Sequence, residues 1–137
     1  MIEYLLDTNV VSEMPRNQPN PHVTAFMASI PESSLFLSVL TIGELRRGVM
    51  RKQAKDAAGA RKYALFIDRL EATFADRILN VEAEVAKLWG RLSADRPRPV
   101  VDTLLAATAI VHDLTLVTRN TADMSGLPVN LINPWLF

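Results

Sequence analysis

Four acidic residues stand where a carboxylate could do chemistry: Asp7, Glu44, Asp102 and Asp123. Each closely follows an apolar run of the sequence or lies near the start of an expected helix. If one edge of a sheet gathers them, two carboxylates ~4 Å apart repel by about 4 kcal/mol at an effective dielectric of ~20. Such a cluster needs a bound cation or raised pKa values. Oxygen ligands without Cys or His favour a hard ion, Mg²⁺ or Mn²⁺.

Each of these acids also has an ordinary structural explanation. The first and the third stand where a helix N-cap is wanted. Asp123 could complete a capping box with Asn120, and Glu44 could pair with Arg47 at spacing i,i+3. Taken singly, the structural explanation is the stronger one. It weakens for the four together, because caps and pairs do not require mutually repelling charges to converge.

Alternating strands and helices are expected to position these acids. Short apolar runs predict strands, and apolar residues at helical spacing predict helices. Asn80 is expected to cap the helix that begins at residue 81. The predicted strands are 2–6, 35–39, 78–81, 114–118 and 129–132, and the predicted helices are 8–14, 22–30, 41–54, 58–74, 81–92 and 102–112. This alternation places the chain in the α/β class, with a parallel sheet covered by helices on both faces. In such sheets the functional crevice lies beyond the carboxyl ends of the strands.

Length and composition limit the class of protein further. A chain of 137 residues, 49% hydrophobic and 22% charged, predicts one globular domain over residues 1–137. The formal net charge is zero, so any nucleic-acid binding must come from local clustering. The absence of cysteine excludes disulfides, thiolate zinc sites and a cysteine nucleophile, and two histidines cannot form a three-histidine site.

The beginning of the chain and its apolar segments bear on location. Acids at positions 3 and 7, with no basic leader, predict neither a signal peptide nor a transit peptide. No apolar stretch approaches the ~20 residues that span a bilayer. We therefore expect a cytoplasmic protein that does not enter the membrane.

One local cluster of positive charge does occur. Between residues 44 and 70 there are eight Lys or Arg against three Asp or Glu. Glu44, Arg47, Arg51 and Lys55 follow one another at i, i+3, i+7 and i+11, which predicts a stripe on one helix face. The stripe fits a path for an RNA backbone, and it also fits a solvated face of mixed charge.

The last five residues, Asn133 to Phe137, are unusually apolar for a chain end. They could dock on the core of the protein or help to cover an interface.

The joint pattern resembles the PIN-domain ribonuclease toxins of the VapC and FitB type. The resemblance lies in LLDTNVVSE (5–13), SVLTIGEL (38–45), VVDTLLAATAIVHDLTLVTRNTADM (100–124) and VNLINPW (129–135), in this order along the whole chain. It implies a three-layer α/β sandwich whose central, mostly parallel sheet has four to five strands flanked by helices. It also implies a Mg²⁺-dependent ribonuclease, with Mn²⁺ as a plausible substitute, that hydrolyses RNA phosphodiester bonds as the toxin of a type II toxin–antitoxin system.

Residue by residue, the resemblance assigns an acidic site. Asp7, Glu44 and Asp102 match the three strongest acidic positions, and Asp123 matches a fourth that varies more in the family. Met124 stands where the family commonly has an aromatic residue, which leaves the packing beside the fourth acid open. The matching polar positions are Thr8, Asn9, Ser38, Thr118 and Asn120. The acids are expected to hold metal, and Thr118 and Asn120 to orient the scissile phosphate or its waters.

The resemblance implies partners as well. Family members usually form homodimers and are held inactive by a small antitoxin, here of the VapB or FitA type, which can insert an arginine among the acids. A guanidinium can pair bidentately with carboxylates, so this insertion would displace metal. DNA is expected to bind only indirectly, through the antitoxin.

Two alternatives belong to other classes of protein. One is a catalytically inert module that keeps the fold and binds RNA or an antitoxin. The other is a phosphohydrolase of the haloacid dehalogenase type, which also begins with a strand ending in aspartate. Asn9 stands where such enzymes use a second aspartate, and no lysine follows Thr118, which argues against that alternative.

Overall fold

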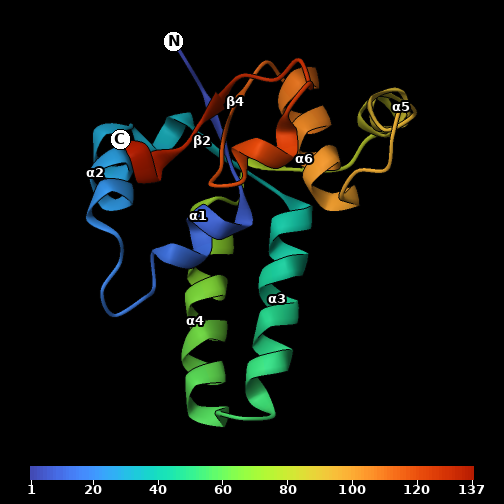
Figure 1. Cartoon of the computed structure of the whole chain (residues 1–137). Helices are drawn as coiled ribbons and strands as arrows, with labels where there is room; N and C mark the ends of the chain where they lie inside the picture. The colour runs from blue at the N-terminus through green and yellow to red at the C-terminus, as the bar shows by residue number, and fades with distance from the viewer.

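A five-stranded, wholly parallel sheet forms the centre of the computed structural model, which describes residues 1–137 (Figure 1). The strands are β1 (Tyr4–Leu6), β2 (Leu35–Ser38), β3 (Ile78–Leu79), β4 (Thr115–Val117) and β5 (Leu131–Ile132). Their order is β3-β2-β1-β4-β5, so β1 is central, with β2 and β4 on either side of it. The register pairs Leu5 with Phe36 of β2 and with Leu116 of β4. The α/β class and the parallel sheet are confirmed, and no antiparallel strand occurs.

Six α-helices and three short 3-10 helices connect the strands. They are α1 (Thr8–Glu13), α2 (Pro21–Ser29), η1 (Glu32–Ser34), α3 (Val39–Gln53), α4 (Ala57–Thr73), α5 (Ala83–Leu92), α6 (Val100–Val111), η2 (Thr121–Met124) and η3 (Pro134–Leu136). All six helices predicted from the sequence are present. All five predicted strands were too long: the one at 114–118 at both ends, and those at 2–6, 35–39, 78–81 and 129–132 at one end.

Side chains that alternate along the strands divide the core into two layers. Leu6 and Leu37 face the helices α1 to α4, where they pack with Val10, Phe26 and Ile67. On the other face Leu5 and Leu116 pack against α6. Helix α5 lies beside α6 on that side (Figure 1). The predicted three-layer arrangement is therefore confirmed.

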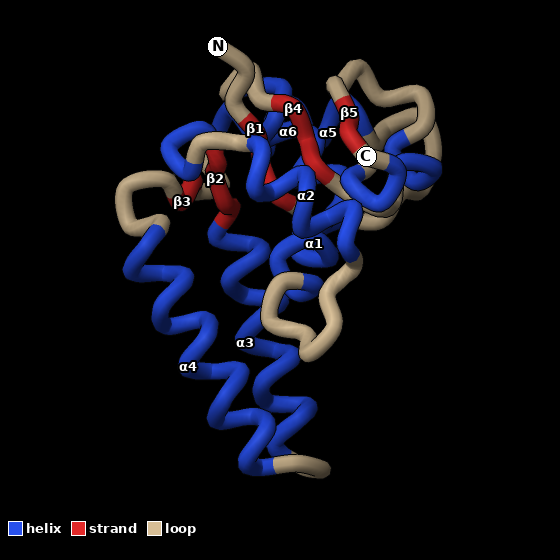
Figure 2. The backbone as a smooth tube through the Cα atoms, turned by 90° about the vertical axis from the view of Figure 1, so that its left-hand side faces the viewer, coloured by secondary structure: helices blue, strands red, loops and turns tan.

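Helices α3 and α4 form a hairpin that extends beyond the sheet (Figures 1 and 2). They pack along their length. Arg46 of α3 links them through ion pairs with Asp68 at 2.7 Å and Glu71 at 3.4 Å. Asp56 caps α4 by accepting a hydrogen bond from the Gly59 N–H. The hairpin carries most of the positive cluster expected from the sequence.

The caps predicted for α5 and α6 were wrong. Helix α6 begins at Val100 with Pro99 as its cap, because the Pro99 carbonyl accepts hydrogen bonds from the backbone and the hydroxyl of Thr103. Asp102 is thus the third residue of the helix and not its cap. Helix α5 begins at Ala83 after Glu82, two residues later than a cap at Asn80 would place it.

None of the helices combines the length and the apolar character that crossing a bilayer requires.

Candidate acidic active site

Asp7 lies at the carboxyl end of β1, the central strand. The Asp7 backbone N–H donates to the Val117 carbonyl at 2.9 Å, which keeps Asp7 in line with the sheet. Asp7 is only 3% exposed. One carboxylate oxygen accepts from the Thr8 N–H at 2.6 Å, so Asp7 also caps α1. The predicted N-cap role is therefore confirmed, and it uses only one of the two carboxylate oxygens.

The second oxygen of Asp7 is held by two side chains from different elements. The Thr118 hydroxyl, fully buried after β4, donates to it at 2.7 Å. The Asn9 amide donates to it at 3.3 Å. Burial raises the pKa of Asp7 above its ordinary value, hydrogen bonds from Thr118 and Thr8 oppose this, and the charge of Glu44 adds to it. The balance is a buried carboxylate that would gain from a nearby cation.

Glu44 reaches the same edge of the sheet from α3. The Thr8 hydroxyl donates to a Glu44 oxygen at 2.5 Å, and it lies 3.3 Å from the hydroxyl of the buried Thr41. Arg47 is 4.0 Å from the other Glu44 oxygen, so the ion pair expected from their spacing is present but long. Thr8 thus connects the first two acids, since its N–H contacts Asp7 and its hydroxyl contacts Glu44.

Asp102 is the least compensated acid of the group. As the third residue of α6 it makes no hydrogen bond or ion pair with another side chain. Desolvation by burial and the charges of Asp7, Asp123 and Glu44 raise its pKa from 3.8 to about 6. Its carboxylate therefore lies within electrostatic reach of the other three, which is the convergence that the sequence pattern suggested.

Asp123 joins the group from η2, where it is exposed. The Asn120 side chain makes no capping bond, so the capping box proposed for this pair is wrong. Met124, the residue that departs from the family pattern, is 1% exposed and packs with Leu105 and Leu116. This buried methionine anchors η2 against α6 and so places Asp123 near Asp102.

Two residues expected around the acids have other contacts in the structure. Ser38 is buried at the end of β2, where its hydroxyl accepts from the Leu40 N–H and caps α3. It makes no hydrogen bond to an acid. The Asn120 N–H donates to the Thr118 hydroxyl at 3.0 Å, so this residue supports the site through its backbone. A role for either side chain in the site stays a prediction.

The four carboxylates are close enough to interact but not close enough to share an ion. No group of three or more Asp, Glu, His or Cys side chains lies within the distances that hold a metal. No Lys or Arg pairs with Asp7, Asp102 or Asp123. The donor set is therefore all oxygen and negatively charged, and only Glu44 has a protein counterion, Arg47 at 4.0 Å, which suits Mg²⁺ or Mn²⁺.

Sequence reasoning missed two residues near this edge. Thr41 lies one helical turn before Glu44, and that i,i+3 spacing was a usable signal. Arg119 directly follows Thr118, and its backbone N–H donates to the Asn9 side-chain oxygen at 3.3 Å. No local spacing could have identified Arg119, because the side chain that its guanidinium contacts, Trp135, lies sixteen residues later in the sequence.

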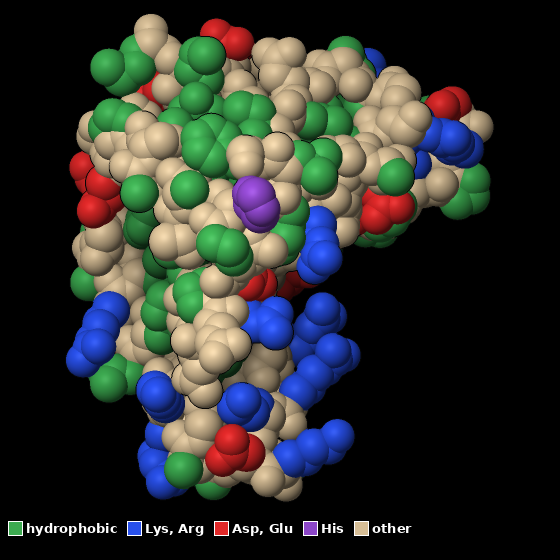
Figure 3. Space-filling view, turned by 60° about the vertical axis from the view of Figure 1, so that its left-hand side comes forward, with side chains coloured by type: hydrophobic (Ala, Val, Ile, Leu, Met, Phe, Trp, Pro, Cys, Tyr) green, Lys and Arg blue, Asp and Glu red, His purple; other side chains and the backbone are tan.

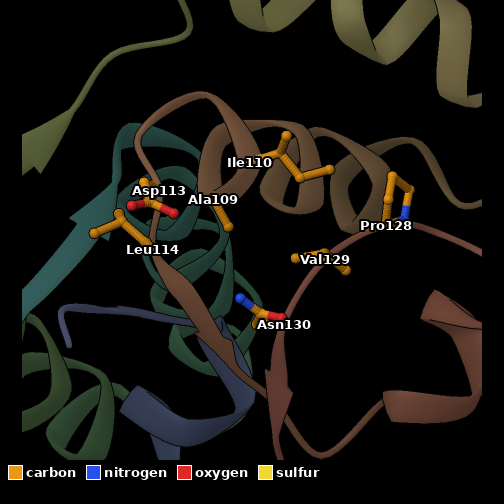
Figure 4. Close-up of a pocket in the computed structure, with 7 residues that line it drawn as sticks. All are labelled: Ala109, Ile110, Asp113, Leu114, Pro128, Val129 and Asn130. Atoms are coloured by element: carbon orange, nitrogen blue, oxygen red, sulfur yellow. The ribbon is translucent and has the colours of Figure 1, made fainter.

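Two pockets lie away from the four acids. A shallow one of about 110 Å³ is bounded by the end of α6 and the segment before β5, including Ile110, Leu114 and Val129 (Figure 4). A more apolar one of about 390 Å³ lies between α1, α2 and α4, lined by residues that include Met14 and Phe66. Neither pocket contains a member of the acidic group.

Comparison with known proteins shows the family to which the chain is similar. A family model described as the PIN domain matches residues 4–125, a span that includes all four acids. Toxin FitB of Neisseria gonorrhoeae is 37% identical over 140 residues, covering 96% of this chain and 97% of the relative. A VapC ribonuclease, Y4jK of Sinorhizobium fredii, is 31% identical over 140 residues, covering 96% of each.

Solved structures share the fold over nearly the full length. The crystal structure of FitAcB from Neisseria gonorrhoeae matches with a TM-score of 0.82 and 35% identity, covering 98% of this chain and 99% of that one. VapBC-5 from Mycobacterium tuberculosis, a member of the VapBC family of toxin–antitoxin systems, matches with a TM-score of 0.66 and 26% identity. The latter match covers 97% of this chain and 99% of that one.

Proposed function

This chain belongs to the PIN-domain family, and on that premise we propose that it is a metal-dependent ribonuclease toxin of a type II toxin–antitoxin system. Its action is hydrolysis of RNA phosphodiester bonds at the acidic group formed by Asp7, Glu44, Asp102 and Asp123. The curated relatives support this proposal, since they carry the names toxin and ribonuclease. We place this activity in the cytoplasm, where the RNA is.

The observation that carries the proposal is the uncompensated charge of the acidic group. Structural carboxylates usually have a cation or a set of donors, as Arg46 provides for Asp68. Asp102 has neither, and burial, together with repulsion from the other three acids, raises its pKa to about 6. A protein that keeps such a group in a partly buried place loses stability unless a cation binds there.

The residues of the chain divide the work at this site. A bound divalent ion would neutralise charge on the phosphate and would lower the pKa of a water, so that hydroxide is available as the nucleophile near neutral pH. Asp7 and Asp102 would be its principal ligands, with Glu44 binding directly or through water. Asp123, the exposed member, would complete the site or accept a proton from the attacking water. Since no three of the acids are within ligand distance together, binding requires side-chain rotation, for which the exposed Asp123 has room.

Thr118 and Asn9 act on Asp7 and not on the substrate. By donating to one carboxylate oxygen, they fix its orientation and favour its ionised form, the form that binds metal. Thr8 does the same for Glu44. These neutral donors hold two acids in place without cancelling their charge.

We expect Thr118→Val to weaken metal binding about ten- to hundredfold, because it removes the hydroxyl that orients Asp7 while keeping nearly the same volume. Titration of Mn²⁺ by calorimetry measures this. Thr108→Val is the matched control: Thr108 is equally buried, but its hydroxyl donates to the Leu104 carbonyl inside α6. Equal Mn²⁺ affinity in Thr118→Val and the wild type would remove this role from Thr118.

The α3–α4 hairpin offers a surface for the RNA backbone. Lys and Arg side chains gather over this projecting part of the molecule (Figure 3). Arg47 and Arg51 are exposed on α3, and Arg47 lies beside Glu44. Lys55 follows the end of α3 at Gln53, so the predicted stripe is a helical face only as far as Arg51. We propose that these three residues bind phosphates of a strand that runs from the acidic group along the hairpin.

Reversing the charge of Arg47 and Arg51 to Glu should weaken RNA binding about tenfold or more and lower its salt slope by about 1.4, the value for two lost phosphate contacts on a single strand. Fluorescence anisotropy with a labelled single-stranded RNA measures both. Lys87 and Arg91 on α5 have the same i,i+4 spacing and exposure, so their reversal is a control for net charge. If both pairs change binding equally, the hairpin has no special part in it.

An antitoxin is the partner we propose for this chain. A solved relative belongs to the VapBC family of toxin–antitoxin systems, and a ribonuclease that is toxic to its own cell must be restrained. The apolar pocket between α1, α2 and α4 gives such a protein a place to bury side chains. A homodimer, DNA binding through the antitoxin and a single domain over residues 1–137 stay predictions.

A second candidate function is an inert module that binds RNA or antitoxin without cleaving. The deciding experiment incubates purified, antitoxin-free protein with end-labelled small RNA in Mg²⁺, Mn²⁺ or EDTA. Discrete metal-dependent products support the ribonuclease. Intact RNA that is nevertheless bound supports the inert module. The family assignment leaves the phosphohydrolase alternative without support.

A further inference from the structure

One arginine beside the acidic group has no carboxylate partner. Arg119 follows Thr118, and its backbone N–H bonds to Asn9, whose amide in turn contacts Asp7. The Arg119 guanidinium makes no ion pair and no hydrogen bond with the chain. It lies 4.9 Å from the centre of the Trp135 ring instead. Within the chain, the guanidinium is therefore held by stacking alone.

The C-terminal segment fixes Trp135 in this place. The Asn133 side chain accepts from the Trp135 N–H at 3.0 Å, and the ring packs against the larger core layer. Phe137 then packs edge-on against Phe26 of α2 at 5.4 Å, and its carbonyl lies 3.0 Å from His22 Nδ1. The C-terminal segment thus lies against α2 (Figure 1). Of the two arrangements expected for this tail, docking on the core is the one present.

This arrangement differs from an arginine used for stability. Arg77, for comparison, donates to the carbonyls of Glu32, Leu35 and Thr73, and its side chain is only 12% exposed. Arg119 is exposed and leaves its guanidinium donors unused within the chain. Stacking on an indole restricts the guanidinium while its N–H groups stay free, so little entropy is lost when a ligand binds.

We propose that Arg119, held by Trp135, binds a phosphate of the RNA strand on the tail side of the acidic group. This inference rests on the proposed ribonuclease function and adds a second contact to it. A free guanidinium matches phosphate oxygens bidentately, whereas four acids alone would repel the RNA backbone. With Arg47 and Arg51 on α3 and Arg119 after β4, cations stand on both sides of Asp7. Arg119 is a substrate-binding residue and Trp135 a positioning residue.

The test separates binding from cleavage. All variants carry Asp7→Asn for the binding arm, in which a labelled single-stranded RNA is titrated at several salt concentrations. We expect Arg119→Ala to weaken binding about tenfold and to lower the salt slope by about 0.7, the loss of one phosphate contact. Arg91→Ala on α5 is the matched control. In the cleavage arm, without Asp7→Asn, Arg119→Ala should raise KM with little change in kcat.

Trp135 is tested with a conservative pair. Trp135→Phe keeps an aromatic face and should retain most of the RNA affinity, whereas Trp135→Leu should lose about as much as Arg119→Ala, although both stay folded by circular dichroism. In the double variant of Arg119→Ala and Trp135→Leu the losses should not add, because the two residues act on one contact.

The outcomes distinguish this inference from the proposed function. If the wild type cleaves RNA and Arg119→Ala binds and cleaves like Arg91→Ala, the phosphate contact is wrong and the ribonuclease stands. If the wild type does not cleave RNA but Arg119→Ala weakens RNA binding, the phosphate contact is supported and the ribonuclease function is not. If Arg119→Ala impairs only the binding of a protein partner, the residue belongs to an interface and the inference is overturned.

Discussion

Replacing Asp7 with Asn should abolish RNA cleavage, lowering its rate on the order of a thousandfold or more, while the chain stays folded. The change removes a charged metal ligand but keeps one oxygen that can accept from the Thr8 N–H, while the new amide N–H can donate to the Thr118 hydroxyl. Because burial raises the pKa of Asp7, losing the charge removes a cost to folding in the metal-free chain. The melting temperature without metal should therefore be equal to or higher than that of the wild type. Gel analysis of end-labelled RNA and thermal denaturation measure the two effects.

Glu13→Gln is the matched control for this experiment. Glu13 is also buried, at 7% exposure, but it lies at the far end of α1 and accepts from the Asn20 N–H at 2.7 Å and from Arg16. Its replacement should lower the melting temperature and leave cleavage intact, the reverse of Asp7→Asn. Undiminished cleavage by Asp7→Asn would remove Asp7 from the site. Loss of cleavage together with unfolding would make the loss structural.

Asp102 should make metal binding and stability depend on pH in opposite directions. Its pKa is about 6 in the folded chain against 3.8 ordinarily, so between these values the folded state holds a proton that the unfolded state has released. The stability of the metal-free chain therefore falls as the pH rises from about 4 to about 6 and then levels off. The full shift corresponds to about 3 kcal/mol, and partial exposure of the side chain reduces our expectation to about 1 kcal/mol.

Metal affinity should rise over the same interval, because the ion binds the ionised carboxylate. Cleavage in Mg²⁺ should increase with pH and level off above an apparent pKa near 6, and added Mn²⁺ should raise the melting temperature more at pH 7 than at pH 5. Urea denaturation of the metal-free chain at several pH values measures the first trend, and metal titrations measure the second.

Two variants check the assignment of this pH dependence to Asp102. Asp102→Asn should reduce the fall in stability to the part that the raised pKa of Asp7 causes, and should weaken the metal effect in parallel. Asp76→Asn changes an exposed acid, 87% exposed and paired only with Arg77, and should leave both trends in place. If the stability of the metal-free wild type instead rises between about pH 4 and about pH 6, the charge of Asp102 is compensated within the folded chain. The argument that the acidic group needs a cation then fails.

Several features of the fold were available from local sequence. Apolar runs of strand length and helical spacing predicted five strands and six helices, and their alternation predicted a parallel sheet. The helix predicted at 8–14 corresponds to α1, which begins right after Asp7 and ends at Glu13. These predictions were correct because each strand and helix must bury its own apolar residues. The spacing of those residues and the ends of apolar runs therefore mark the element locally. The start of α6 was missed, since a capping carbonyl of Pro99 leaves no side-chain signal.

The candidate site was only partly accessible in the same way. Residue types and the resemblance to a family selected four acids. From the sequence alone, however, an aspartate can equally be part of a capping box, an N-cap or a metal ligand. The tertiary structure separated them: it gave Asp7 a cap and two further donors, left Asp102 without any, and placed Ser38 in a cap. Which acid needs a cation depends on its neighbours in space.

By itself, then, the sequence determined the class of fold, selected the four acids and predicted an oxygen-only metal site. Only the tertiary structure decided how those acids are held, because the donors come from distant parts of the chain. Thr118 meets Asp7 across 111 positions, and Thr8 meets Glu44 across 36. Arg119 finds its aromatic support only when the C-terminal segment docks. Contacts of this kind follow from the packing of the sheet and its helices, and no local pattern of residues specifies them.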